Sequence, residues 1–204
     1  MAARGRPKSD EKRQQILAAA AQLFTGQGYE RTSLEQVAVE AGVSKQTIYN
    51  NFPSKEALLR TCILHRCEEA NIAGEDLDFS LPPEQFLPLF AERFISTLTE
   101  AQPVAMYRLV MAESERHPEV GEAFYESGPK PVVTALADYF ERATARGELA
   151  VDQPMMAATQ YLFMIKGFTV DMALVGIAEE ARPFPTDSYV QYCTDLFLRA
   201  NAVA

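Results

Sequence analysis

Residues 32–52 read TSLEQVAVEAGVSKQTIYNNF, and this stretch decides the fold of the N-terminal part of the chain. Thr32 is predicted to cap a first short helix, and Glu35 three residues later would complete a capping box. The apolar residues that recur on one face at helical spacing are Leu34, Val37, Ala38 and Ala41. The stretch therefore begins with a short amphipathic helix.

A second short helix is predicted after Gly42, a residue suited to the left-handed C-terminal cap of the first helix. Ser44 is placed to cap this second helix. Val43, Ile48 and Phe52 are expected to point inward, and the polar residues between them outward. An exposed helix rich in hydrogen-bond donors and acceptors is typical of the recognition helix of a helix-turn-helix. The pattern therefore indicates DNA binding.

The distribution of charge supports this interpretation, although the 204-residue chain carries a net charge of −9. Residues 1–66 contain ten Lys/Arg and six Asp/Glu, a net charge of +4, whereas the remainder contains nine and twenty-two, a net charge of −13. Basic charge is thus concentrated around the predicted helix-turn-helix. A local basic region of this kind is the electrostatic signature of a DNA-binding segment.

Residues 9–59 resemble the TetR family of transcriptional regulators. The resemblance rests on the joint spacing of ten residues, which is more specific than a lone helix-turn-helix: Phe24, Gly28, Thr32, Ala38, Gly42, Val43, Ser44, Tyr49, Phe52 and Lys55. It covers the first third of the chain, and a looser similarity to the AefR-like branch runs over residues 118–149. The resemblance implies an all-α fold with an N-terminal three-helix DNA-binding domain and a larger helical ligand-binding and dimerisation domain.

Four parts are expected along the chain. Residues 1–8 would be a disordered basic arm, residues 9–53 the DNA-binding domain, residues 54–73 a connecting helix, and residues 74–204 the effector-binding and dimerisation domain. Ser9 is expected to cap the first helix, which would end near Gly26 to Gly28. Proline and glycine separate the further helices, which are predicted at 84–100, 104–116, 119–126, 131–146, 154–176 and 187–200.

The resemblance assigns DNA contacts to individual residues. Ser44, Thr47, Tyr49 and Lys55 correspond to residues that hold phosphates or the adjacent bases. Lys45, Gln46 and Asn50 are candidates for base-edge contacts, because Gln and Asn pair bidentately with adenine and Lys donates to guanine. Thr32, Ser33 and Asn51 complete the set. The chain departs from the usual family pattern at Gln46 and Asn51, and each single residue could instead be a solvated polar side chain.

Lys55 is expected in the first turn of the connecting helix, where its charge opposes the helix dipole. A phosphate would compensate that charge, and the free amides of the turn would add to an anion site. An ordinary surface lysine is the alternative.

The N-terminal segment RGRPK resembles the core of an AT-hook. Arg4 and Arg6 flank a glycine, and Pro7 keeps the chain extended, so the arm could enter a narrow AT-rich minor groove. Alternatively, it is a basic tail that adds only salt-dependent affinity. Both interpretations stay open at this point.

Cys62, His65 and Cys67 do not form a metal site. At about 100° per residue, Cys67 lies about 140° around the helix from Cys62, so the side chains do not converge on one ion. Neither a nucleophile–base arrangement nor a glycine-rich phosphate loop occurs in the sequence. We therefore expect no metal, no cofactor and no enzymatic activity.

Aromatic and methionine residues are frequent in the C-terminal part, where most of them would form the core. Met and Tyr also suit a pocket for an apolar or aromatic ligand, and the family keeps its effector pocket in this domain. The candidates for ligand contact are Phe90, Met106, Tyr107, Met111, Tyr125, Tyr139, Tyr161 and Met164.

The last two helices are expected to form a homodimer interface, as in the family. Residues 161–177 are apolar almost all round, and the last helix offers the stripe Tyr189, Val190, Cys193, Leu196 and Phe197. A dimer would match a palindromic DNA operator.

The sequence thus predicts a cytoplasmic, sequence-specific regulator, most often a repressor in this family, that a small and partly apolar effector releases from double-stranded DNA. No segment has the features of a signal peptide or is long and apolar enough to span a bilayer. Two alternatives stay open: a ligand-independent or architectural DNA-binding protein, and control by a partner protein instead of a ligand.

Overall fold

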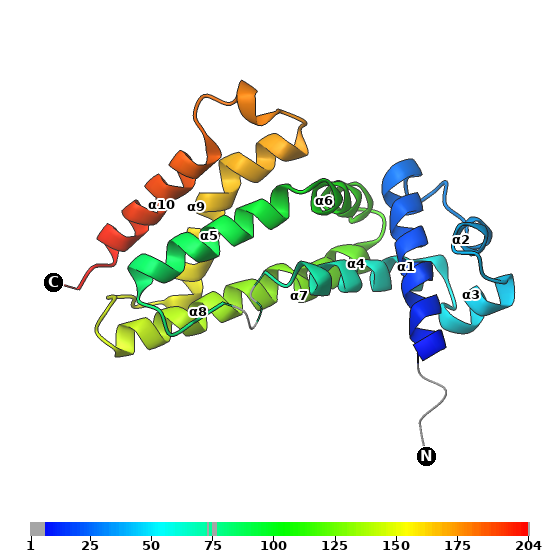
Figure 1. Ribbon diagram of the computed structural model, residues 1–204, viewed down its shortest axis with the longest axis horizontal. Helices are drawn as coiled ribbons and strands as arrows, with labels where there is room; N and C mark the ends of the chain where they lie inside the picture. Colours follow the sequence, from blue (N-terminus) through cyan, green and yellow to red (C-terminus); the bar gives the residue numbers. More distant parts are fainter. Residues whose placement is uncertain (1–6, 73, 75–76, 204) are drawn as a thin grey trace, which may run out of the picture. The chain divides into compact units, whose positions relative to one another are not determined.

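The computed structural model describes residues 7–72, 74 and 77–203, and within them the secondary structure is entirely helical (Figure 1). The α-helices are α1 Pro7–Gln27, α2 Leu34–Glu40, α3 Lys45–Asn51, α4 Lys55–Ala70, α5 Pro83–Thr99, α6 Ala101–Glu113, α7 Pro118–Ser127, α8 Pro129–Ala145, α9 Pro154–Leu174 and α10 Thr186–Ala200, with a 3-10 turn η1 at Glu179–Ala181. The all-α prediction is confirmed. None of the described helices combines the length and apolar composition needed to cross a bilayer.

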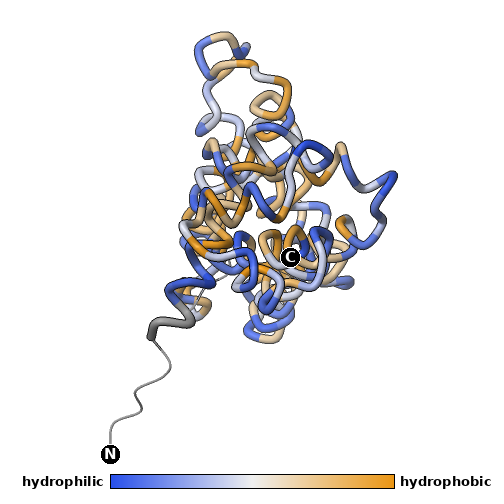
Figure 2. The backbone as a smooth tube through the Cα atoms, turned by 90° about the vertical axis from the view of Figure 1, so that its right-hand side faces the viewer, coloured by the Kyte–Doolittle hydropathy of each residue, from blue (hydrophilic) through white to orange (hydrophobic). Residues whose placement is uncertain are grey.

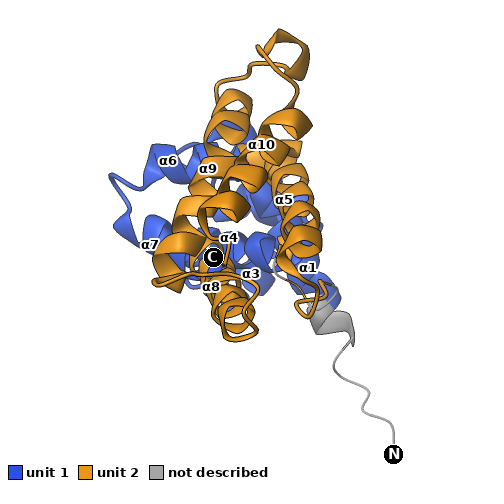
Figure 3. Ribbon diagram, turned by 90° about the vertical axis from the view of Figure 1, so that its left-hand side faces the viewer, with its two compact units in different colours: residues 1–69, 105–127 blue, residues 70–104, 128–204 orange. Residues whose placement is uncertain are grey.

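Two compact units divide the chain, and each has its own hydrophobic core (Figure 3). Along the helices, hydrophobic and hydrophilic segments alternate, as expected when one face of a helix packs inward (Figure 2).

Four α-helices were expected in the DNA-binding and connecting parts, and six after them, and all ten are present.

Unit 1 consists of residues up to 69 together with residues 105–127. Its core joins the buried faces of α1 to α4 to residues of α6 and α7. The core residues include Ile16, Phe24, Val37, Ile48, Phe52, Leu59, Ile63, Met106, Val110 and Val120. The helix-turn-helix therefore shares one core with α7 and most of α6, which the expected boundary at residue 74 did not anticipate.

Unit 2 consists of residues 70–104 and 128–204. Helices α5, α8, α9 and α10 enclose a core rich in aromatic rings, among them Phe86, Phe90, Tyr139, Phe140, Tyr161 and Phe197. The rings of Phe86 and Tyr139 stack with centroids 4.0 Å apart. The buried hydroxyls are satisfied: Tyr139 donates to the Leu81 carbonyl at 3.0 Å, and Tyr161 lies 2.9 Å from the Thr194 hydroxyl.

Several predicted helix ends are wrong by a few residues. Helix α1 begins at Pro7, so Ser9 lies inside the helix and does not cap it. Proline suits a first helical position because its fixed φ is already helical and its missing N–H leaves no donor unpaired. Helix α6 ends at Glu113 rather than Arg116, and α7 begins at Pro118.

The predicted dimer stripe on α10 is wrong for three of its five residues. Val190, Cys193 and Phe197 are buried in the core of unit 2, where Phe197 stacks on Phe140 with centroids 4.9 Å apart. Spacing alone identifies an apolar face but not the partner against which that face packs. Leu196 of the stripe is exposed.

Candidate DNA-binding site

Helix α2 begins with a complete capping box, but one residue later than predicted. Ser33 is the N-cap: its Oγ accepts from the Gln36 amide at 3.2 Å, and Oε1 of Gln36 accepts from the Ser33 amide at 2.8 Å. Thr32 is only 2 % exposed, and its hydroxyl donates to the Gly28 carbonyl at 2.9 Å. Thr32 therefore closes the turn before the helix, and the predicted pair of Thr32 and Glu35 is wrong.

The turn between α2 and α3 has the predicted glycine cap. Gly42 has φ of +64°, a left-handed conformation that a side chain disfavours. The Gly42 amide donates to the Val39 carbonyl at 3.1 Å, and the Val43 amide to the Ala38 carbonyl at 3.0 Å. These two bonds are those of a Schellman motif, which fixes the direction in which the chain leaves α2.

Helix α3 presents a polar face outward, as predicted. Oγ of Ser44 accepts from the Thr47 amide at 3.2 Å and so caps the helix. Ile48 is 0 % and Phe52 2 % exposed, which fixes the buried face. The exposed residues of the helix are Lys45, Gln46, Tyr49, Asn50 and Asn51.

Two amide side chains of α3 are linked along the helix. Nε2 of Gln46 donates to Oδ1 of Asn50 at 2.8 Å, so these two candidates for base contact form one polar group one helical turn long. Asn51 instead turns back, and its Nδ2 donates to the Thr47 carbonyl at 2.8 Å. Gln46 and Asn50 thus lie together on the exposed face, whereas the amide of Asn51 is bonded to its own helix.

Tyr49 connects the two helices of the motif. Its hydroxyl donates to Oε1 of Glu35 in the first turn of α2 at 3.0 Å. The pKa of Glu35 is held below its usual range, first by a hydrogen bond from its own backbone amide and then by the bond from the Tyr49 hydroxyl. This carboxylate is therefore ionised at neutral pH. A phosphate could therefore bind the Tyr49 hydroxyl only by displacing Glu35.

Lys55 is engaged within unit 1 rather than free at the surface. Its Nζ donates to the Tyr29 carbonyl at 3.0 Å and lies 4.1 Å from the centroid of the Tyr29 ring. The carbonyl and the ring compensate the charge that opposes the helix dipole. Nζ also lies 3.5 Å from the Glu30 carbonyl, so a phosphate contact of Lys55, which stays a prediction, would have to replace one of these interactions.

Arg4 and Arg6 lie outside the described residues. The eight residues predicted to contact a ligand are divided between the units: Met106, Tyr107, Met111 and Tyr125 belong to unit 1, and Phe90, Tyr139, Tyr161 and Met164 to unit 2. Met111 is 65 % and Tyr125 55 % exposed, whereas Tyr139 and Tyr161 are fully buried. An exposed apolar hollow on α9 is lined by other residues, namely Met155, Met156, Thr159, Gln160 and Phe163.

Two substitutions at Ser44 separate helix capping from DNA contact. Ser44→Ala is expected to destabilise the protein by about 1 kcal/mol, and Ser44→Gly by only a few tenths, because glycine is itself an acceptable N-cap. Both variants lack the hydroxyl, so both should bind DNA more weakly by a similar factor. Urea unfolding and DNA titration measure the two effects. If Ser44→Gly binds DNA like the wild type, the hydroxyl acts only as a cap.

Comparisons with known proteins agree with this geometry. Residues 16–62 match the family described as bacterial regulatory proteins, tetR family, and residues 85–203 match the C-terminal domain of AefR-like transcriptional repressors. The HTH-type transcriptional regulator UidR of Escherichia coli strain K12 is 28 % identical over 173 residues, which cover 83 % of this chain and 85 % of UidR.

Solved structures show the same similarity over nearly the whole chain. The flavonoid-responsive regulator FrrA is 34 % identical with a TM-score of 0.80, covering 95 % of this chain and 98 % of FrrA. A TetR-family regulator from Mesorhizobium loti MAFF303099 is 27 % identical with a TM-score of 0.84, covering 96 % and 99 %. The chain therefore belongs to the TetR family of bacterial transcriptional regulators, which are DNA-binding proteins and not enzymes.

Proposed function

We propose that the chain is a homodimeric repressor that leaves a palindromic operator when a small, partly apolar effector binds. The observation that carries this proposal is the exposed polar face of α3, held by a capped turn and by the buried Ile48 and Phe52. A rigid helix with free donors and acceptors can enter the major groove and read base edges.

Gln46 and Asn50 are the proposed base-reading pair. Replacing either by alanine is expected to cost about 1–3 kcal/mol in binding to the operator and to relax the preference at one or two base pairs. Because Gln46 donates to Asn50, the two losses should not add in the double variant. Anisotropy titrations on operator variants at fixed salt measure both effects.

A matched control for this pair is Gln36→Ala, in the capping box of α2. That substitution should lower stability without changing which base pairs are preferred, since Gln36 is committed to the Ser33 amide. Unchanged preferences in both the Gln46 and Asn50 variants would refute the assignment of base reading to this pair.

The dimer would form through the outer faces of α9 and α10. Large apolar side chains remain exposed there, including Met156 (67 %), Phe163 (65 %) and Tyr192 (63 %). Apolar side chains that stay exposed on neighbouring helices favour burial against a second copy. Two recognition helices related by a two-fold axis would read inverted half-sites about 34 Å apart, on one side of the DNA.

Two of the helices are continuous across the boundary between the units, and we infer that control by an effector passes along them. Helix α4 runs from Lys55 to Ala70, and unit 2 begins at Ala70; α6 crosses from unit 2 into unit 1 between residues 104 and 105. An effector that prefers one angle between the units would change the separation of the recognition helices. The coupling is reciprocal, so DNA should weaken effector binding by the same factor.

The chemistry of the effector is proposed from the aromatic residues of the C-terminal part and from one relative. FrrA, which is 34 % identical, responds to flavonoids according to its name. Flavonoids are aromatic and carry hydroxyl groups, which fits the partly apolar effector expected from the Met and Tyr content. A flavonoid is thus the first compound to test.

Selection of bound sequences from a random DNA library tests the proposal. Enrichment of an inverted repeat is expected, followed by release of the protein from that repeat when a flavonoid is added. Enrichment without symmetry would contradict the dimer. Release by no compound would favour ligand-independent regulation, and no enrichment at all would favour an architectural protein.

A further inference from the structure

A buried carboxylate without a partner lies at the end of α6. Glu113 is 8 % exposed, and among the described residues its buried Oε2 has no hydrogen-bond partner. Burying an ionised carboxylate is unfavourable, so such groups are normally hydrogen-bonded, paired or bound to a metal ion. The DNA-binding function makes no use of Glu113.

The turn after α6 brings an imidazole beside this carboxylate. The His117 amide donates to the Glu113 carbonyl at 2.8 Å, and α7 begins at the next residue, Pro118. The ring of Tyr29 packs edge-on against His117, with centroids 4.9 Å apart. Oε1 of Glu119 lies 3.4 Å from Nδ1 of His117 and can orient the ring so that Nε2 faces away from Glu119.

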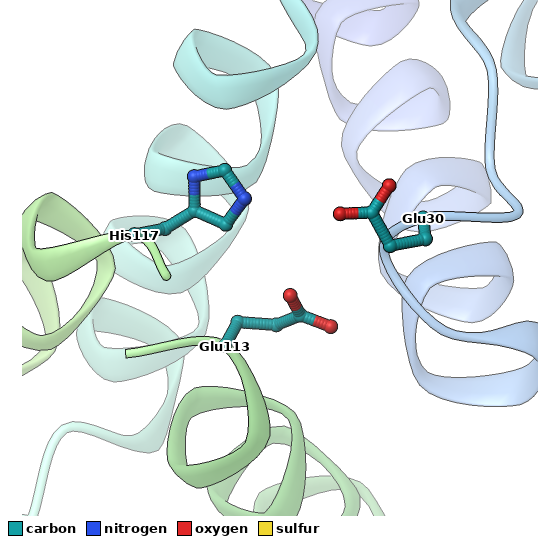
Figure 4. A group of neighbouring side chains, drawn as sticks. All are labelled: Glu30, Glu113 and His117. Atoms are coloured by element: carbon teal, nitrogen blue, oxygen red, sulfur yellow. The ribbon is translucent and has the colours of Figure 1, made fainter. Parts of the chain in front are cut away.

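A second carboxylate approaches from the turn between α1 and α2. Glu30 is exposed, but its neighbour Tyr29 is held by the bond from Lys55 to the Tyr29 carbonyl. Ligand atoms of Glu30, Glu113 and His117 lie within 4.8 Å of one another, and all three residues belong to unit 1. Figure 4 shows the two carboxylates and the imidazole converging on one space.

These separations are close to those of a metal site. Ligand atoms at 2.0–2.2 Å from one tetrahedral ion lie about 3.3–3.6 Å apart, so atoms up to 4.8 Å apart need to approach by about 1 Å. The side chain of Glu30 is exposed and that of His117 half-buried, so rotamer changes can bring their ligand atoms this much closer to Glu113. An imidazole among carboxylates suits Zn²⁺, Mn²⁺ or Fe²⁺ better than Mg²⁺ or Ca²⁺, whose preferred ligands are all oxygen.

We propose that Glu30, Glu113 and His117 bind a divalent transition-metal cation. The ion would tie the turn before the helix-turn-helix to the corner between α6 and α7. Glu119 would act as the outer partner that fixes the imidazole, as carboxylates commonly do behind metal-bound histidines. Metal binding would then stabilise the unit that carries α2 and α3.

Zn²⁺ titration against a chromophoric chelator tests the site, using full-length protein stripped of metal. The Cys67→Ser background removes a half-buried thiol that could also bind zinc. One equivalent should bind saturably and raise the melting temperature. Glu113→Gln and His117→Gln should each weaken binding by about 10-fold or more, since even the loss of an outer partner costs 10- to 100-fold.

Glu122→Gln is the matched control, because it removes the same charge from an exposed position of α7. It should leave zinc binding unchanged. The Glu113 variant could lose zinc because it misfolds, since Glu113 is buried. Glu30→Gln avoids this problem because Glu30 is exposed, and it should also weaken zinc binding. The proposal is overturned if no stoichiometric binding occurs, or if the Glu30 and His117 variants bind zinc as the background protein does.

Discussion

Replacing Phe163 and Leu196 together by glutamate is expected to convert the protein to a monomer and to reduce operator affinity by several orders of magnitude. Phe163 on α9 is 65 % and Leu196 on α10 42 % exposed, so neither contributes much to the core of its own unit. In a two-fold dimer each substitution occurs twice, and unpaired charges in a buried interface cost several kcal/mol each. Light scattering and DNA titration measure the two losses.

Leu89→Glu is the control for this prediction. Leu89 is 51 % exposed on α5, in the same unit, and outside the proposed interface. This variant should stay dimeric and bind DNA normally. A Phe163/Leu196 variant that remains dimeric at micromolar concentration would move the interface to another surface, and one that is monomeric yet binds DNA at full affinity would remove the need for a dimer.

Tyr161→Ala is expected to lower the free energy of unfolding by about 3–5 kcal/mol, whereas Tyr161→Phe should cost only about 1 kcal/mol. The Tyr161 ring is fully buried beside Phe197, with centroids 5.0 Å apart, and the alanine variant would leave a cavity there. Phenylalanine loses only the hydroxyl, which bonds to Thr194 and to the Leu87 carbonyl. Denaturant unfolding followed by circular dichroism provides both values.

This pair of variants also decides between two roles for Tyr161. If the ring formed the wall of an open effector pocket, its removal would enlarge the pocket, change effector affinity and destabilise the protein much less than removal from a packed core. The fully buried ring and the two bonded partners of its hydroxyl favour the role in the core.

The helix-turn-helix was predictable from the sequence because its signals are local. Gly42 and Ser44 act within four residues of themselves, through a left-handed turn and a capping bond, so their neighbours in sequence determine their roles. The wrong choice of Thr32 instead of Ser33 as the N-cap of α2 also reflects this local character of the signals. Both residues are suitable caps, and only the packing of Thr32 into the preceding turn excludes it.

Contacts between distant segments could not be predicted in this way. A helix at residues 104–116 was predicted, but its packing into the core of unit 1 depends on residues some 45 positions earlier, such as Leu59 and Ile63. The face of α10 that stays exposed was predicted wrongly for the same reason, because Val190, Cys193 and Phe197 pack against distant segments of unit 2. Glu30 and Glu113 are brought together only by the tertiary fold, and no sequence motif joins them.

The most direct test of the account is fluorescence-anisotropy binding of the purified protein to the DNA upstream of its own gene, compared with a scrambled fragment at physiological salt. Specific readout by α3 predicts a preference of about 10³-fold or more for the upstream fragment. That preference should fall sharply in the Gln46→Ala variant, while binding to the scrambled fragment hardly changes. Equal affinity for upstream and scrambled DNA, together with no enriched site in library selection, would contradict sequence-specific regulation by this chain.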